Sequence, residues 1–161
     1  MKQPRPTTAL LLIDHGSRRA AANRTLAGVA ALFRAELGDT WMVTHAHMEL
    51  APPTVADALA DCAGAGVQEV FCLPYMLAPG RHATEDIPAQ VRQAATAHPE
   101  LTVHCTAPLG LHPGMLDIVL QRCGRNRRAA PTHKPCVGDH CRGEPATCQE
   151  PHCYCALRSA T

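Results

Sequence analysis

Apolar runs and amphipathic stretches alternate along this chain from Thr8 to Cys123. The first run, residues 9–13, contains four consecutive large aliphatic residues and no polar interruption. A strand without polar alternation is typical of a parallel sheet that is covered on both faces. The apolar runs predict four strands, at residues 8–13, 41–48, 67–73 and 101–105.

The stretches between these runs have apolar residues at helical spacing. Residues 20–37, for example, place Leu26, Ala30 and Phe33 on one face of a helix. Predicted helices follow the strands at residues 20–37, 54–64, 84–97 and 116–123. Regular alternation of strand and helix predicts a parallel sheet with right-handed crossovers. The expected fold class is therefore α/β, a four-stranded parallel sheet with helices on both faces.

The alternating pattern stops at Gly124. A charged run, Arg125-Asn126-Arg127-Arg128, and two prolines come next, and then a cysteine-rich segment begins. We predict an α/β domain at residues 1–124, a linker at 125–135 and an irregular tail at 136–161.

Five of the nine cysteines lie in the predicted tail: Cys136, Cys141, Cys148, Cys153 and Cys155. In a cytosolic protein such a cluster binds metal more often than it forms disulfides. Thiolates at this density are candidate ligands of an iron–sulfur cluster or of zinc. Their spacing matches neither a compact ferredoxin run nor a C-x2-C zinc knuckle. A flexible metal-scavenging tail and disulfides are the alternatives.

Composition and charge argue against some classes of binding partner and some cellular compartments. The net charge of +1 argues against a nucleic-acid or anionic-membrane surface. The apolar run at residues 9–13 is too short for the core of a signal peptide and far too short to cross a bilayer. We expect a cytoplasmic protein without a nucleic-acid or membrane partner. A nucleotide-binding protein is poorly supported, because neither a Walker loop nor a G-x-G-x-x-G motif occurs.

Polar side chains follow the ends of all four predicted strands. They are His15, then Glu49, then the group Arg81, His82 and Glu85, and last His112. Because parallel strands end at one edge of a sheet, we expect these residues to converge there. Neutral imidazole suits Fe²⁺, Co²⁺, Ni²⁺ and Zn²⁺, and two histidines leave coordination positions open for chemistry. The pattern predicts a reactive metal site formed by His15 and His82.

Simpler interpretations of the same residues stay open from the pattern alone. A loop histidine is usually solvated or locally hydrogen bonded. Glu49 could cap the helix that follows it, and Glu85 could favour a helix N-terminus through the dipole. Arg18 and Arg81 are more often solvent-facing residues.

Five motifs follow one another in an order that resembles the short CbiX/SirB-type sirohydrochlorin chelatases. They are HGSR at 15–18, ELAPPT at 49–54, PYMLAPGRH at 74–82, EDIP at 85–88 and PLG at 108–110. The resemblance covers residues 8 to about 123. It implies a chelatase-like fold that corresponds to one half of a longer chelatase and that pairs as a homodimer.

The same resemblance implies insertion of a divalent metal into sirohydrochlorin for cobalamin or sirohaem synthesis. Cobalt is the first expectation, with ferrous iron or nickel as the others. In the family, histidines at the positions of His15 and His82 bind the metal. Insertion removes protons from pyrrole nitrogens while the metal loses water, so a histidine would hold the metal and accept a proton. Glu49 or Glu85 would assist as base.

Substrate contacts are expected from two further pairs of residues. Sirohydrochlorin carries carboxylates around its rim, and Arg18 and Arg81 are candidate anchors for them. Met76 and Leu77 would cover the face of the macrocycle. The alternative from another class is a non-catalytic metal-binding or metal-delivery protein. The cysteine-rich tail alone favours a metal carrier, whereas the loops at the sheet edge favour the enzyme. Tight binding of sirohydrochlorin would distinguish the enzyme from the carrier.

Overall fold

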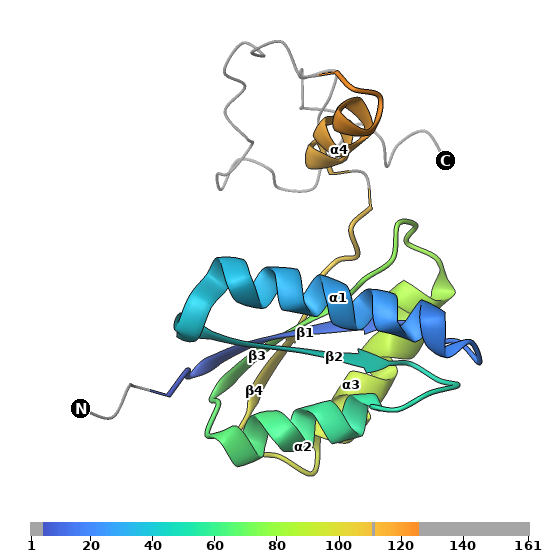
Figure 1. Ribbon diagram of the computed structural model, residues 1–161. Helices are drawn as coiled ribbons and strands as arrows, with labels where there is room; N and C mark the ends of the chain where they lie inside the picture. Colours follow the sequence, from blue (N-terminus) through green and yellow to red (C-terminus); the bar gives the residue numbers. More distant parts are fainter. Residues whose placement is uncertain (1–4, 111, 126–161) are drawn as a thin grey trace, which may run out of the picture. The chain divides into compact units, whose positions relative to one another are not determined.

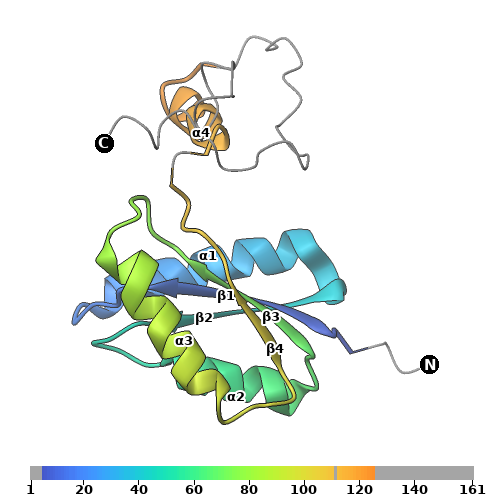
Figure 2. The ribbon, with the colours of Figure 1, turned by 180° about the vertical axis from the view of Figure 1, so that it is seen from behind.

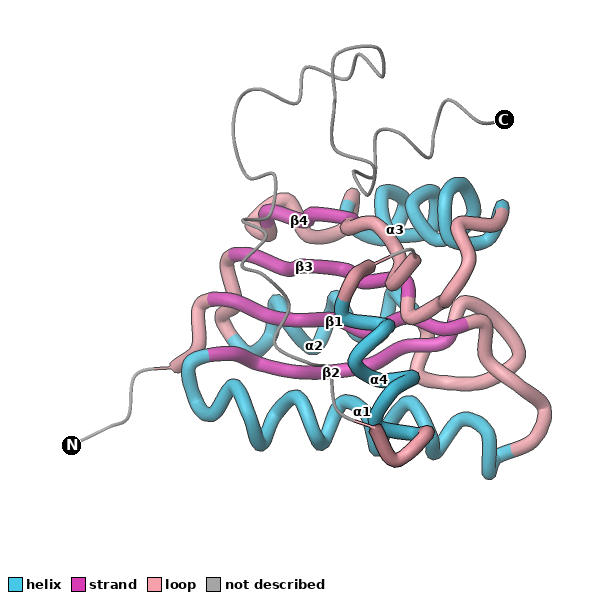
Figure 3. The backbone as a smooth tube through the Cα atoms, turned by 90° about the horizontal axis from the view of Figure 1, so that it is seen from above, coloured by secondary structure: helices cyan, strands magenta, loops and turns pink. Residues whose placement is uncertain are grey.

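The computed structural model describes residues 5–110 and 112–125. Its strands are β1 (Thr8–Asp14), β2 (Trp41–His47), β3 (Glu69–Pro74) and β4 (Thr102–Cys105). Its helices are α1 (Ala20–Leu37), α2 (Val55–Ala65), α3 (Ile87–Ala95) and α4 (Gly114–Arg122), with a 3-10 turn at Gly38–Thr40. The strands form one parallel sheet in the order β2-β1-β3-β4, with β2 and β4 at its edges (Figure 3). The expected α/β fold with a four-stranded parallel sheet is confirmed.

Helices cover both faces of this sheet (Figure 1). On one face, Leu26 and Ala30 of α1 pack in a buried cluster with Leu12 of β1. On the opposite face, Leu59 of α2 and Ile87 of α3 are completely buried in a larger cluster. Figure 2 shows α2 and α3 together on that face. The core of the sheet therefore has two layers of aliphatic side chains, as expected for unbroken apolar strands.

The described residues fall into two compact units, which divide after Gly110. The first holds the sheet with α1, α2 and α3, and the second holds α4. Within the described residues, no helix is long and apolar enough to cross a membrane.

The start of the third helix differs from the sequence-based expectation. Residues 82–86 form a π-helical turn, and only from Ile87 onward does the regular helix α3 run. In this turn the N–H of Ile87 donates to the carbonyl of His82, five residues earlier. Pro88 lies in the first turn of the regular helix, where its missing N–H is tolerated. Such wide turns occur often at functional sites, and this one begins at a predicted metal ligand.

A capping box formed by Thr54 and Asp57 starts α2. The hydroxyl of Thr54 accepts the N–H of Asp57, and the Asp57 carboxylate accepts the N–H of Thr54. These two bonds satisfy N–H groups that a helix start leaves unpaired. They fix the point at which the loop after β2 turns into α2, and this loop carries Glu49.

Candidate metal site

Backbone hydrogen bonds tie together the loops at the carboxyl end of the sheet. The N–H of Met48 donates to the carbonyl of Asp14 at 2.8 Å, and the N–H of Glu49 donates to the carbonyl of His15 at 3.1 Å. On the other side of β1, the N–H of Tyr75 donates to the carbonyl of Ile13 at 2.6 Å. The loop of His15 is therefore held between the loops that follow β2 and β3.

Gly16 allows the first two loops to approach this closely. Its φ of +82° lies in the left-handed region, which glycine adopts without steric cost. A Cβ atom at this position would lie 2.0 Å from the carbonyl oxygen of Glu49 and 3.0 Å from Cβ of His47. No other residue fits without moving one of the two loops.

The two predicted metal-binding histidines lie side by side at this edge. The ring centroids of His15 and His82 are 5.1 Å apart, with 70° between the ring planes. Nε2 of His15 lies 2.9 Å from Oε1 of Glu49. All three side chains are partly open to solvent, with exposed fractions of 41%, 53% and 51% for His15, His82 and Glu49. The structure thus brings together residues from three separate loops that the sequence pattern proposed to converge.

A carboxylate orients His82. Nδ1 of His82 lies 2.8 Å from Oδ2 of Asp86, one helical turn later. Because a carboxylate only accepts, Nδ1 carries the proton, and Nε2 keeps its lone pair for a metal ion. A carboxylate behind a ligating histidine fixes its tautomer and raises its basicity.

His15 can both bind a metal and carry a proton. Its Nδ1 lies 3.1 Å from the carbonyl oxygen of Gly16, which accepts the Nδ1 proton. In the neutral ring Nε2 then has a free lone pair, and in the protonated ring Nε2–H donates to Glu49. The pair is therefore able to take up a proton next to the position where a metal would lie.

A hydrogen bond between buried His47 and partly buried Asp14 supports the first loop. His47 is 1% exposed, and its Nδ1 lies 2.5 Å from Oδ1 of Asp14. The same Asp14 oxygen accepts the N–H of Gly16 at 2.9 Å. Next to this pair, the pKa of His45 is lowered, first by burial and then by His47. Neither the apolar pattern nor the motifs point to Asp14 and His47 as supporting residues, although Asp14 directly precedes His15.

Arg81 and Glu85, which neighbour His82 in sequence, pair with other residues. Arg81 forms ion pairs with Glu85 at 3.8 Å and with Asp86 at 3.6 Å. Within the described residues, Glu85 pairs with Arg81 and with neither histidine, and its side chain is 70% exposed. Glu49 is therefore better placed than Glu85 to exchange a proton with His15.

The remaining predicted site residues occupy varied environments. Met76 is partly buried against the larger core cluster, whereas Leu77 is 64% exposed. Arg18 is exposed and lines an open cavity beside the start of α1. The five tail cysteines lie outside the described residues. In the part of the chain that the structure describes, no three His, Cys, Asp or Glu side chains are arranged to hold a metal ion by themselves. A metal held by the histidine pair would thus keep positions for other ligands.

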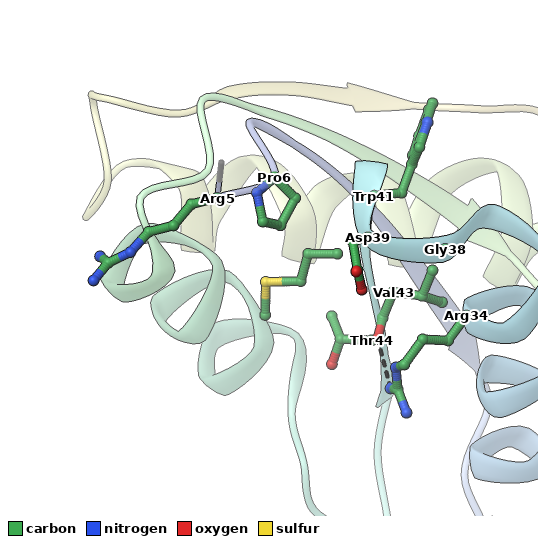
Figure 4. Close-up of a pocket in the computed structure, with 9 residues that line it drawn as sticks. Arg5, Pro6, Arg34, Gly38, Asp39, Trp41, Val43 and Thr44 are labelled. Carbon is green, nitrogen blue, oxygen red and sulfur yellow. Dashed lines mark hydrogen bonds between the residues drawn. The ribbon is translucent and has the colours of Figure 1, made fainter. Parts of the chain in front are cut away.

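A larger cavity, of about 510 Å³, lies away from this site (Figure 4). Residues before β1, at the end of α1 and along β2 line it, among them Arg5, Asp39 and Trp41. Arg34 also lines the cavity and donates from Nη2 to the carbonyl of Val43 at 2.7 Å. This cavity includes neither of the paired histidines nor Glu49.

Comparison with known proteins decides the family. The family model described as CbiX matches residues 9–126 of this chain. The chain belongs to the CbiX family. Over 113 residues it is 39% identical to the chloroplastic sirohydrochlorin ferrochelatase of Arabidopsis thaliana, a match that covers 70% of this chain and 50% of that protein. Over 121 residues it is 33% identical to the sirohydrochlorin cobaltochelatase of Methanococcoides burtonii, covering 70% of this chain and 92% of that protein.

Solved structures of the CbiX family have the same fold. A cobalamin-biosynthesis CbiX protein from Marinobacter aquaeolei matches with a TM-score of 0.60 and 27% identity, over 73% of this chain and 98% of that one. The sirohydrochlorin chelatase SirB from Bacillus subtilis subspecies spizizenii, in complex with cobalt, matches with a TM-score of 0.65 and 25% identity. This match covers 73% of the present chain and 50% of SirB. The chain thus spans about half the length of SirB and of the plant relative, and the CbiX match ends before the cysteine-rich tail.

Proposed function

We propose that this CbiX-family protein is a sirohydrochlorin chelatase that inserts a divalent metal ion into sirohydrochlorin. The observation that carries the proposal is the pairing of His15 and His82, with ring centroids 5.1 Å apart, at the open edge of the sheet. Relatives that match over most of the described residues are named as sirohydrochlorin ferrochelatases and cobaltochelatases. An enzyme of this kind needs an open metal site rather than a closed one, because the metal must leave the protein for the macrocycle.

The proposed reaction divides its work between the two histidines. His82, with its Nδ1 proton held by Asp86, presents Nε2 to the incoming metal substrate. His15 lies beside it and is backed by Glu49 at 2.9 Å. As the metal replaces the protons of two pyrrole nitrogens, His15 accepts a proton and passes it through Glu49 to solvent, for which half-exposed Glu49 is well placed. The second proton leaves by the same pair after the first has been released.

The metal substrate in this proposal is Co²⁺ in the first place, or Fe²⁺. Both ions accept imidazole nitrogen, and the choice between such metals follows geometry and availability more than affinity. The named relatives include enzymes for each metal, so the assay below uses both ions and Ni²⁺.

A homodimer is part of the same proposal. The histidines and Glu49 are each about half exposed, whereas a metal-insertion site works best where water is limited. A second copy of the chain would cover the macrocycle on the side that is open here. Light scattering after gel filtration tests this, and a monomer at assay concentrations would refute it.

The cysteine-rich tail and the compartment stay sequence-based predictions. An iron–sulfur cluster or zinc in the tail predicts coloured or zinc-containing protein after anaerobic purification. Colourless protein without iron or zinc would remove this part of the proposal. The cytoplasmic location is tested by fractionation of cells that produce the full chain.

The function is tested by an anaerobic absorbance assay. Wild-type protein is mixed with sirohydrochlorin and Co²⁺, Fe²⁺ or Ni²⁺ in turn, and the rate is compared with the protein-free background. We expect acceleration by wild type and a background rate for His82→Ala. The matched control is His98→Gln, which removes an imidazole paired with Glu100 beyond the end of α3 and should leave the rate unchanged. A protein that binds the metal, does not bind sirohydrochlorin and does not accelerate insertion would be a metal-delivery protein instead.

A further inference from the structure

An open cavity of about 430 Å³ lies beside the predicted metal site. One wall comes from the start of α1 and the residues before it, including Arg18 and Arg24. The opposite wall comes from the loop after β2, with Leu50 and Pro52, and His45 also lines the cavity. The two walls belong to the same loops that carry His15 and Glu49.

The positive charge of this cavity is not balanced locally. The guanidinium groups of Arg18 and Arg24 form no ion pair within the described residues. None of the described residues that line the cavity is Asp or Glu. Arg81 is different, because Glu85 and Asp86 already neutralise it. Two arginines without an ion pair in the described residues therefore line this cavity, whereas the arginine beside His82 is paired.

The second wall has the opposite character. Leu50, Ala51 and Pro52 form an apolar surface, and Leu50 is 49% exposed. A ligand that fits both walls has an anionic end and an apolar body. A carboxylate on a short alkyl arm of a macrocycle meets this description, since guanidinium groups bind carboxylates in charge-assisted pairs.

The connection along the chain places the cavity next to the reaction. Arg18 follows His15 by three residues, and Leu50 directly follows Glu49. Asn23 of α1 donates from Nδ2 to the carbonyl of Ser17 at 2.8 Å, which ties this loop to the first turn of the helix. Arg18 and Arg24 thus lie on one segment that directly follows the loop of His15.

We propose that this cavity binds a peripheral carboxylate arm of the tetrapyrrole substrate, with Arg18 and Arg24 as its cationic partners. The inference rests on the proposed function and adds Arg24 to the substrate-binding residues, while it assigns Arg81 to the support of the His82 turn. It locates the rim contact on the side of β2, opposite to the turn that holds His82.

The test measures the dependence of the insertion rate on sirohydrochlorin concentration for Arg18→Gln and Arg24→Gln. We expect KM for sirohydrochlorin to rise by roughly tenfold in each, as for loss of one charge-assisted hydrogen bond, with KM for the metal unchanged. The matched control is Arg19→Gln, because Arg19 is exposed, sits between the cavity residues in sequence and does not line the cavity. Its KM should stay within about twofold of wild type, since an exposed charge outside the cavity contributes little.

Each other outcome overturns the inference in a recognisable way. An equal rise in KM for all three variants would mean that overall charge, rather than the cavity, attracts the substrate. No rise in Arg18→Gln and Arg24→Gln would show that the cavity is not used. Weakened binding of inorganic phosphate, with sirohydrochlorin binding unchanged, would show a site for a free anion instead.

Direct titration of sirohydrochlorin without metal separates this inference from the proposed function. One possible result is that sirohydrochlorin binds wild type, binds the two cavity variants about tenfold more weakly and is never metallated. That result would support the cavity as a substrate-binding site and refute the chelatase activity. Substrate that fails to bind wild type would overturn both.

Discussion

Replacing Gly16 with alanine tests whether close contact between two loops builds the site. The substitution adds one Cβ atom in a left-handed backbone conformation, 2.0 Å from the carbonyl oxygen of Glu49. The backbone conformation costs a non-glycine residue about 1–2 kcal/mol. Overpacking against a backbone atom costs about 1–3 kcal/mol more. We therefore expect the free energy of unfolding to fall by about 2–5 kcal/mol.

The same substitution should reduce metal insertion more than its effect on stability explains. To relieve the contact, the loop of Glu49 must move away from Gly16, and the 2.9 Å pair between Glu49 and His15 then opens. The unfolding free energy is measured by urea denaturation, and the insertion rate is measured at a temperature where the variant is still folded. Gly28→Ala is the control, because an added Cβ at this position within α1 has no atom within 4 Å.

The control should shift stability in the opposite direction. Alanine in the interior of a helix is favoured over glycine by about 0.5–1 kcal/mol, so Gly28→Ala should be slightly more stable and fully active. Unchanged stability and activity in Gly16→Ala would refute the reasoning. That result would mean that the two loops are not in contact as described.

Three further outcomes follow from other parts of the site and the core. Asp86→Asn should weaken Co²⁺ binding by at least about tenfold, because it loosens the bond that orients His82; unchanged affinity in a metal titration would contradict this. The hydrogen bonds from Thr54 lower the pKa of Asp57 below its ordinary value of 3.8. Asp57 therefore stabilises the fold above that pH and loses this effect as the pH falls through its lowered pKa, so Asp57→Asn should flatten stability measured against pH in acid. Burial raises the pKa of Cys72 to about 12, so iodoacetamide at neutral pH should label it only after denaturation, as peptide mass spectrometry would show.

The sheet and the convergence of the histidines were predictable from local sequence. Unbroken apolar runs mark buried parallel strands, and parallel strands place their following loops at one edge. His15 and His82 follow two such strands, so the topology alone predicts that they lie near each other. The structure confirms the elements to within a few residues and places the two rings side by side.

The support of the site was not predictable in the same way. Asp14 and His47 pair because the register of β1 and β2 sets them opposite each other, and strand order is not encoded in any short motif. Asp86 orients His82 across the π-helical turn at residues 82–86. Both contacts depend on three-dimensional geometry that hydrophobic periodicity does not report.

The most direct test of the account is a double-mutant cycle on His15 and His82. Insertion rates are compared for wild type, His15→Ala, His82→Ala and the double variant, with equal folding verified by denaturation. In the proposed reaction His82 holds the metal ion while His15 accepts the pyrrole proton, so the two imidazoles act in one step. Each single variant should then lose nearly as much activity as the double variant, because groups that work as a unit are strongly non-additive. Independent losses that multiply in the double variant would contradict joint action of the two histidines at this edge of the sheet.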